Sequence, residues 1–134
     1  MSDLLLDIVT YFTSSGFCAG DGIDAFRDFT PETPDSMISV VEYSGDPGSA
    51  VDVSTVHRSF QISVRAKSAT ESKNKARQLY NALNSSTRFV KLTSERWSLV
   101  YLRQSPFKIK VDAAGRNYYG FNIGITSYID EGGL

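Results

Sequence analysis

The sequence predicts an α+β fold in which two helices pack on one face of a mostly antiparallel β-sheet. Two observations predict it. Apolar residues recur with helical spacing in two separate segments, and elsewhere they alternate with polar residues as they do in strands. The order is one helix, two or three strands, a second helix and about four strands. No repeat or linker divides the chain, so we expect residues 1–134 to form one domain.

Both helices have recognisable ends. Residues 3–15 are expected to form the first helix, and Gly16 is placed to end it in the left-handed conformation. Its apolar stripe contains Leu5, Ile8, Val9 and Phe12. Residues 68–84 are expected to form the second helix, in which Ser68 and Glu71 match a capping box. Its expected buried stripe contains Ala69, Ala76, Leu79, Tyr80 and Leu83.

The first extended segments lie between the two helices. Residues 25–30 and 36–43 are short and end at prolines or polar turns. For the second of these we expect one face to carry Met37, Val41 and Tyr43. Residues 53–67 alternate most clearly, so that Phe60, Ile62 and Val64 are expected to face the core. His57, Ser59, Gln61, Ser63 and Arg65 then face water or a wet interface.

The second half is extended throughout. The expected strands are residues 88–93, 96–103, 107–111 and 117–129. Ser94 and Glu95 are a candidate hairpin turn. Residues 112–115, Asp-Ala-Ala-Gly, have the composition of a type I turn followed by a left-handed glycine.

The net charge of −1 hides an uneven distribution along the chain. Residues 1–55 contain ten acidic side chains and one basic, whereas residues 56–116 contain thirteen basic and three acidic ones. The fold either mixes the two halves, so that their charges neutralise each other, or presents two surfaces of opposite sign. Two such surfaces would attract copies head to tail, into a ring or a filament.

The residues offer little material for catalysis. His57, the only histidine, lies on the polar side of an expected strand, where a solvated side chain is the ordinary interpretation, and Cys18 lies in a segment without an activating motif. Asp21 and Asp24 lack the spacing of a calcium loop. The carboxylates Asp28, Glu32 and Asp35 are expected to be solvated. We therefore expect no enzyme, no cofactor and no metal site. One cysteine also excludes an internal disulfide.

The composition also bears on location and on nucleic-acid binding. No apolar run approaches the roughly 20 residues of a spanning helix, and no basic stretch opens the chain, so we expect a soluble cytoplasmic domain without membrane contact. The basic segment 56–116 is an alternative binding surface for nucleic acid. Its candidate platform is Trp97, Tyr101, Lys108, Lys110, Arg116 and Tyr118.

The chain as a whole resembles a known family. The segments PDSMISVVEYSG, RSFQISVRAKSATESKNKARQLYNAL and RWSLVYLRQSPFKIKVDAAGRNYYGFNIGITSYID are similar to tailed-bacteriophage minor capsid proteins, and more closely to tail-terminator or head–tail joining proteins. The resemblance extends from the first helix to Ile129. It rests on the order of elements and carries no catalytic signature.

The resemblance implies a structural role in the virion. A homo-oligomeric ring, commonly a hexamer, would sit on the tail tube, end its polymerisation and dock the head connector, with DNA only passing through. A tail-tube or baseplate subunit is a further possibility that shares the ring. The protein would be found at the neck of the virion, and in the host cytoplasm during assembly; purified, it is expected to be a ring or a monomer.

Six residues are candidates for this role. Residues 44–52 are long for a hairpin loop and are a candidate arm that orders against a neighbouring subunit. The candidate subunit-interface residues are Asp46, Asp52 and Arg58. The candidate lumen-facing residues are His57, Gln61 and Arg65.

Overall fold

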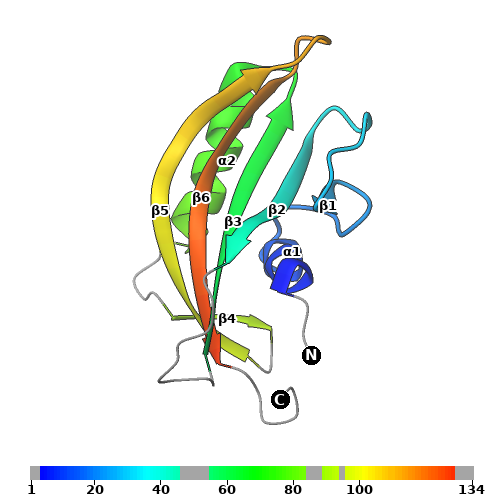
Figure 1. Ribbon diagram of the computed structural model, residues 1–134. Helices are drawn as coiled ribbons and strands as arrows, with labels where there is room; N and C mark the ends of the chain where they lie inside the picture. Colours follow the sequence, from blue (N-terminus) through cyan, green and yellow to red (C-terminus); the bar gives the residue numbers. More distant parts are fainter. Residues whose placement is uncertain (1–3, 46–54, 84–88, 94–95, 129–134) are drawn as a thin grey trace.

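The fold is the expected α+β arrangement (Figure 1). The computed structural model describes residues 4–45, 55–83, 89–93 and 96–128. In chain order its elements are α1 (Leu4–Ser14), β1 (Ala25–Arg27), β2 (Met37–Gly45), β3 (Thr55–Ala66), α2 (Ala69–Leu83), β4 (Phe89–Thr93), β5 (Arg96–Val111) and β6 (Asn117–Tyr128).

The six described strands form one sheet in the order β1-β2-β3-β6-β5-β4. All neighbouring strands are antiparallel except β1, which runs parallel to β2. The long strands β3 and β6 lie at the centre and pair from Thr55 with Tyr128 to Ala66 with Asn117. At one edge, β4 pairs only with the Arg96–Leu99 end of β5.

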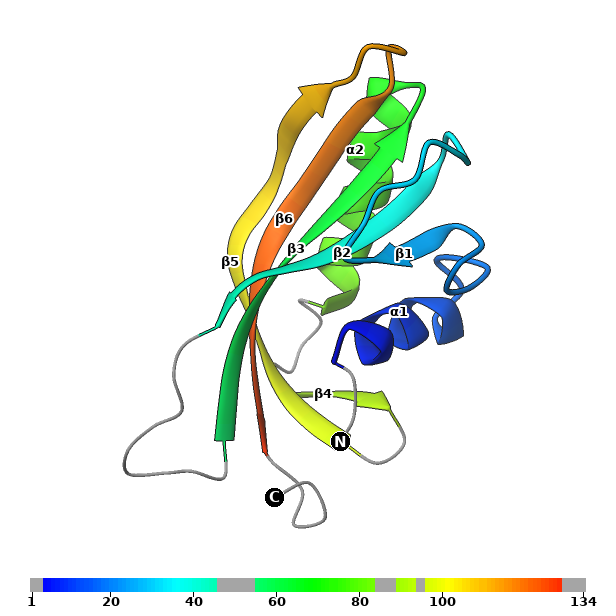
Figure 2. The same cartoon turned by 45° about the vertical axis from the view of Figure 1, so that its right-hand side comes forward.

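Both helices lie on one face of the sheet. Helix α2 packs on β3, β5 and β6, whereas α1 contacts β1, β2 and β4. Figure 2 shows how the sheet curls, so that β4 and the start of β5 pass beneath α1. The core between helices and sheet includes Ile8, Phe12, Val40, Phe60, Ile62, Leu79, Phe121 and Ile123, each at most 1% exposed.

The helix predictions are confirmed with one difference. The stripe of α1 is buried, and Gly16 has φ +84° directly after the helix. At the start of α2 the Glu71 amide donates to Ser68 Oγ at 3.3 Å, which is half of the expected capping box. Ala69 is exposed, and Ser72 takes its place in the buried stripe with Ala76, Leu79 and Leu83.

Met37 and Val41 of β2 share one face of the sheet as expected, because they pair with Arg65 and Gln61, and this is the face opposite the helices. Ile38 and Val40 point into the core, and Ser39 is buried on the other face of the sheet. Segment 28–36 crosses that face, because the Ser39 hydroxyl donates to the Phe29 carbonyl at 3.2 Å. Tyr43 is 51% exposed, at a register shift between β2 and β3 that interrupts the alternation.

The second half has fewer strands than expected. The two segments 96–103 and 107–111 form the single strand β5, whose pairing with β6 shifts register at three places. The turn at 112–115 is confirmed, since Gly115 has φ +82° and its amide donates to the Asp112 carbonyl at 2.9 Å. The candidate turn at Ser94 and Glu95 lies outside the described residues.

Candidate functional site on the helix-free face of the sheet

The face of the sheet opposite the helices carries the most elaborate polar contacts of the molecule. We call it the helix-free face. On β3 it presents Ser59, Gln61, Ser63 and Arg65, and on β6 their pairing partners Gly124, Asn122, Gly120 and Tyr118. Two different sites lie along it, an arginine cluster at one end and a row of amides in the middle.

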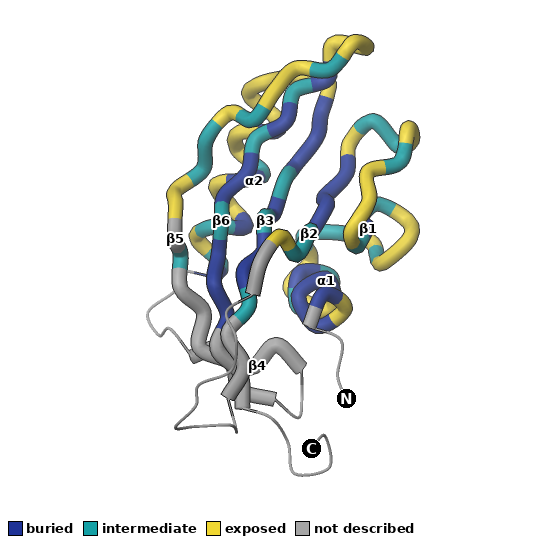
Figure 3. The backbone as a smooth tube through the Cα atoms, in the orientation of Figure 1, coloured by how far each residue is buried: buried dark blue, intermediate teal, exposed yellow. Residues whose placement is uncertain are grey.

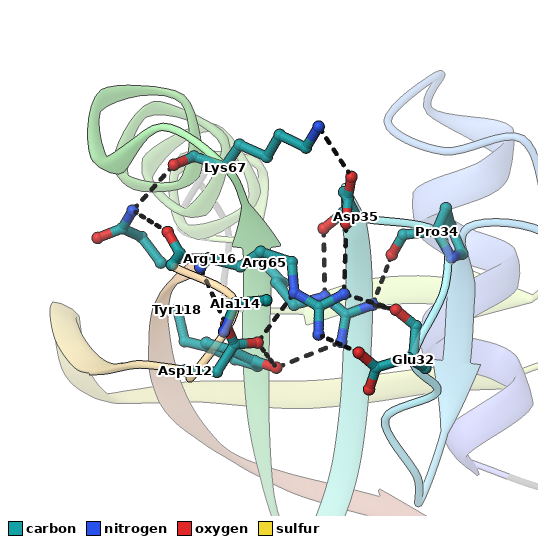
Figure 4. A network of polar contacts seen from close by, with 11 residues as sticks. Glu32, Pro34, Asp35, Arg65, Lys67, Asp112, Ala114, Arg116 and Tyr118 are labelled. Atoms are coloured by element: carbon teal, nitrogen blue, oxygen red, sulfur yellow. Dashed lines mark hydrogen bonds and ion pairs between the residues drawn. The ribbon is translucent and has the colours of Figure 1, made fainter.

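The arginine cluster is centred on two buried guanidinium groups (Figure 4). Arg65 is 1% exposed and is held almost entirely by neutral oxygens. Its Nε donates to the Asp35 carbonyl at 3.2 Å, its Nη1 to the Tyr118 hydroxyl at 3.2 Å, and its Nη2 to the carbonyls of Glu32 and Pro34. A buried cation is thus solvated by segment 32–35 instead of water.

Arg116 is held by carboxylates. Its Nε donates to Asp112 Oδ2 at 2.9 Å, its Nη1 to Asp35 Oδ1 at 3.3 Å, and its Nη2 to Glu32 Oε1 at 3.2 Å. The Tyr118 hydroxyl donates to Asp112 Oδ2 at 3.2 Å and so links the two arginines. The cluster ties segment 32–35 to β3, to β6 and to the turn between β5 and β6.

Two carboxylates of the cluster, those of Asp35 and Asp112, have lowered pKa values. The pKa of Asp112 lies below its ordinary value because the Arg116 backbone amide, and then its guanidinium, donate to it. The pKa of Asp35 is lowered first by the hydrogen bond from Lys67 and then by Lys67 and Arg116 as charges. Burial acts to lower the pKa of Arg116, but Asp112 outweighs it and the pKa is raised.

The amide row crosses three strands. Gln61 Nε2 on β3 donates to Asn122 Oδ1 on β6 at 3.3 Å, and Asn122 Nδ2 donates to Gln104 Oε1 on β5 at 3.0 Å. Gly120 lies beside the row, where β6 passes so close to β3 that a Cβ would overlap the Ile62 carbonyl oxygen. The amide row in the middle of the helix-free face is therefore neutral and hydrogen-bonded from β3 to β5.

Ion pairs between the two halves of the chain favour the interpretation that the fold mixes their charges. Arg58 donates to Glu42 through two contacts of 2.6 and 2.7 Å. Lys67 lies 3.3 Å from Asp35, which is shared with Arg116. Each pair joins a base from 56–116 to an acid from 1–55, so part of the sequence asymmetry is neutralised inside one subunit.

The candidate lumen residues lie in different environments. Gln61 is half-buried in the amide row. The structure differs from the expectation at Arg65, which is turned away from solvent because segment 32–35 covers it. The backbone of His57 pairs with Thr126, and its side chain lies outside the described residues.

Of the three candidate interface residues, one lies within the described residues. Arg58 lies on β3 in its ion pair with Glu42, and its side chain is 25% exposed. Asp46 and Asp52 lie outside the described residues, as does most of the candidate arm 44–52.

Several other sequence candidates have ordinary local roles. The Cys18 pKa is raised by burial, which disfavours the nucleophilic thiolate. Asp24 accepts from the amides of Ala19 and Gly20, and Asp21 pairs with Arg27 at 3.0 Å. Among the described residues there is no group of three or more His, Cys, Asp or Glu side chains placed to hold a metal ion. Within the same residues no helix is long and apolar enough to cross a membrane.

Sequence reasoning missed the arginine cluster as a unit. Asp28, Glu32 and Asp35 were expected to be solvated, and Asp28 and Glu32 are indeed exposed. What was missed is that each has a partner: Asp28 Oδ1 accepts from the Glu42 amide, and the other two accept from Arg116. The available signal was the spacing of Asp112 and Arg116 around the turn, four residues apart with Gly115 between them.

The described residues thus form a curled sheet whose helix-free face carries a buried ionic cluster and a row of hydrogen-bonded amides. A comparison with family models gives the identity. The chain belongs to the bacteriophage tail terminator protein family, whose model matches residues 11–129. This places the protein among the structural components that complete phage tails, acting with other proteins of the virion. No curated protein matches the sequence.

Proposed function

We propose that this protein caps the phage tail tube as a closed homo-oligomeric ring, ends the polymerisation of the tube and presents the surface on which the head connector docks. The family match over residues 11–129 carries the proposal. The ring works at the neck of the virion after assembly in the host cytoplasm. Its role needs neither catalysis nor a cofactor.

The ring number is proposed to be six. A ring requires a heterologous contact, in which two different surfaces of the subunit meet. The candidate arm 44–52 supplies one element of this contact, through Asp46 and Asp52. Reversing both charges should weaken self-association and leave the melting temperature unchanged; an unchanged oligomer mass would remove the arm from the proposal.

The middle of the helix-free face suits the wall of the central hole. The Gln61–Asn122–Gln104 row is neutral, and it presents no fixed cation that would hold a phosphate backbone. Passing DNA would therefore meet hydrogen-bonded amides, with His57 further along the same strand. Arg65 is left out of this wall because it is buried within the subunit.

Tail-tube assembly tests the function directly. Purified tube subunits are polymerised with and without this protein, and tube lengths are measured by electron microscopy. We expect capped ends and arrested growth in its presence, and continued growth with an unrelated α+β protein of similar size. Tubes that lengthen equally in both reactions would contradict the proposal.

The nucleic-acid alternative has lost part of its support. Arg58, Arg65 and Arg116 are engaged in contacts within the subunit, which leaves fewer bases of segment 56–116 for phosphates. DNA retention separates the two functions, because binding through six or more phosphate contacts weakens roughly 10³-fold or more between 50 and 200 mM salt. Retention with such a salt dependence would support the alternative.

A further inference from the structure

The two edges of the sheet carry opposite charge. At one edge, β1 has a strand neighbour on one side only, and residues 21–28 around it contain Asp21, Asp24 and Asp28 against Arg27. At the other edge, the described part of β4 covers only the Arg96–Leu99 end of β5. Among the described residues, no strand pairs with the far half of β5 on that side, and this half exposes Lys108 and Lys110, the second of which lies over the Tyr118 ring. We call these the β1 edge and the β5 edge.

Each edge also exposes apolar side chains that the fold of one subunit leaves in water. At the β1 edge Ile23 is 63% and Phe29 is 56% exposed. Phe29 lines a shallow pocket of about 390 Å³ together with Leu5, Phe26 and Asp28. At the β5 edge Val111 is 48% exposed, next to Lys110. Apolar groups combined with opposite charges match the composition of a protein contact.

The backbone of the β5 edge is poorly suited to pairing with another strand. Pro106 has no backbone N–H, and register shifts around Gln104 and between Lys108 and Lys110 break the regular row of donors and acceptors. A partner must therefore meet this edge through side chains. The two lysines and Val111 are the exposed groups that it offers at its far end.

We propose that the β5 edge of one copy docks against the β1 edge of the next, with Lys108 and Lys110 facing Asp28 and the net acidic segment 21–28, in which Arg27 already pairs with Asp21, and with Val111 facing Ile23 and the Phe29 pocket. The partner is a second copy of this chain, selected by charge complementarity. Since β2, β3 and β6 separate the two edges, the contact is heterologous and repeats around an axis. The inference rests on the proposed ring and names the surfaces that close it.

A charge reversal with a matched control tests the contact. K108E/K110E places glutamates against the aspartates of the neighbouring copy, and we expect self-association at least about tenfold weaker. K73E/R77E makes the same change of charge on the exposed face of α2, and we expect it to associate as the wild type does. If K108E/K110E and K73E/R77E both self-associate as strongly as the wild type, the proposed contact is overturned. Equal melting temperatures show that all three proteins are folded.

A cysteine pair gives a positive readout. In I23C/V111C both new thiols are exposed, and three strands separate their edges, far beyond the roughly 7 Å that a disulfide spans within one chain. Mild oxidation should give covalent dimers and longer ladders, whereas I23C paired with Q78C on α2 should give none. No ladder from I23C/V111C, in a preparation whose wild type forms oligomers, would place the contact elsewhere.

These outcomes separate the two proposals. Oligomers that tolerate K108E/K110E and fail to cross-link contradict the edge contact and leave the ring standing. A wild type that neither oligomerises nor assembles on tail tubes contradicts the proposed function itself.

Discussion

The arginine cluster and the amide row lie on the same face of the same sheet but differ in charge and burial: the cluster contains buried cations, and the row contains neutral side chains. Figure 3 shows the central strands β3 and β6 largely buried or half-buried along their described length. The cluster buries two cations under segment 32–35, with three carboxylates around Arg116. The amide side chains of the row are neutral, and Gln61 and Asn122 are half-buried. The two buried charges are thus bound within the subunit, and the amide row beside them is uncharged.

The largest expected effect is at Arg65. Arg65→Met removes the guanidinium and takes this donor from the carbonyls of Pro34 and Asp35, whereas the Glu32 carbonyl still accepts from Arg116 Nη1; we expect a cost of about 3 kcal/mol in the free energy of unfolding. Chemical denaturation measures it. Arg77→Met, on the exposed face of α2, is the matched control and should change stability by less than about 0.5 kcal/mol. Similar losses in the free energy of unfolding for both variants would show that the buried Arg65 stabilises the protein no more than an exposed arginine does.

The next effect concerns the close approach of β3 and β6. Gly120→Ala should destabilise the protein by about 2 kcal/mol, because the added methyl overlaps the Ile62 carbonyl and the strands must move apart. In Gly20→Ala the new Cβ would meet only the tip of Ile23 at 3.6 Å, an ordinary contact. A thermal melt of both proteins checks this, and a Gly120→Ala protein as stable as Gly20→Ala would contradict it.

The amide row should contribute less. Asn122→Ala removes both hydrogen bonds of the row, yet water reaches the groups that are left, so we expect a loss of about 1 kcal/mol. Asn74→Ala on exposed α2 serves as its control in the same denaturation series. A loss as large as that of Arg65→Met would erase the difference between the two sites.

The smallest effect is at Asp35 and depends on pH. Its pKa is lowered in the folded protein, so its contribution to stability is present above about pH 4 and is lost as pH falls through the folded value. Asp35→Asn should therefore be less stable than the wild type at pH 7, and the difference should shrink towards pH 3. A difference that is constant between these pH values would rule out the assigned ionic role.

The periodic parts of the fold were predictable from sequence, and the cluster was not. Val64 and Ile62 were assigned to the core because alternation is local and strong in β3. The same alternation assigned Arg65 to water, because it shows on which face of the sheet a side chain lies but not whether another segment covers that face. Its burial depends on Pro34 and Asp35, some thirty positions earlier, and no local pattern announces that this segment crosses the face. The parallel pairing of β1 is hidden for the same reason.

The central claim is that this protein acts by joining copies of itself head to tail around an axis. Native mass spectrometry of the wild type, alone and after incubation with tail tubes, tests it most directly. We predict a single closed species of defined copy number, six in the proposed ring, that is lost in K108E/K110E and kept in K73E/R77E. A protein that stays monomeric in both conditions, or grows without limit, would contradict the claim.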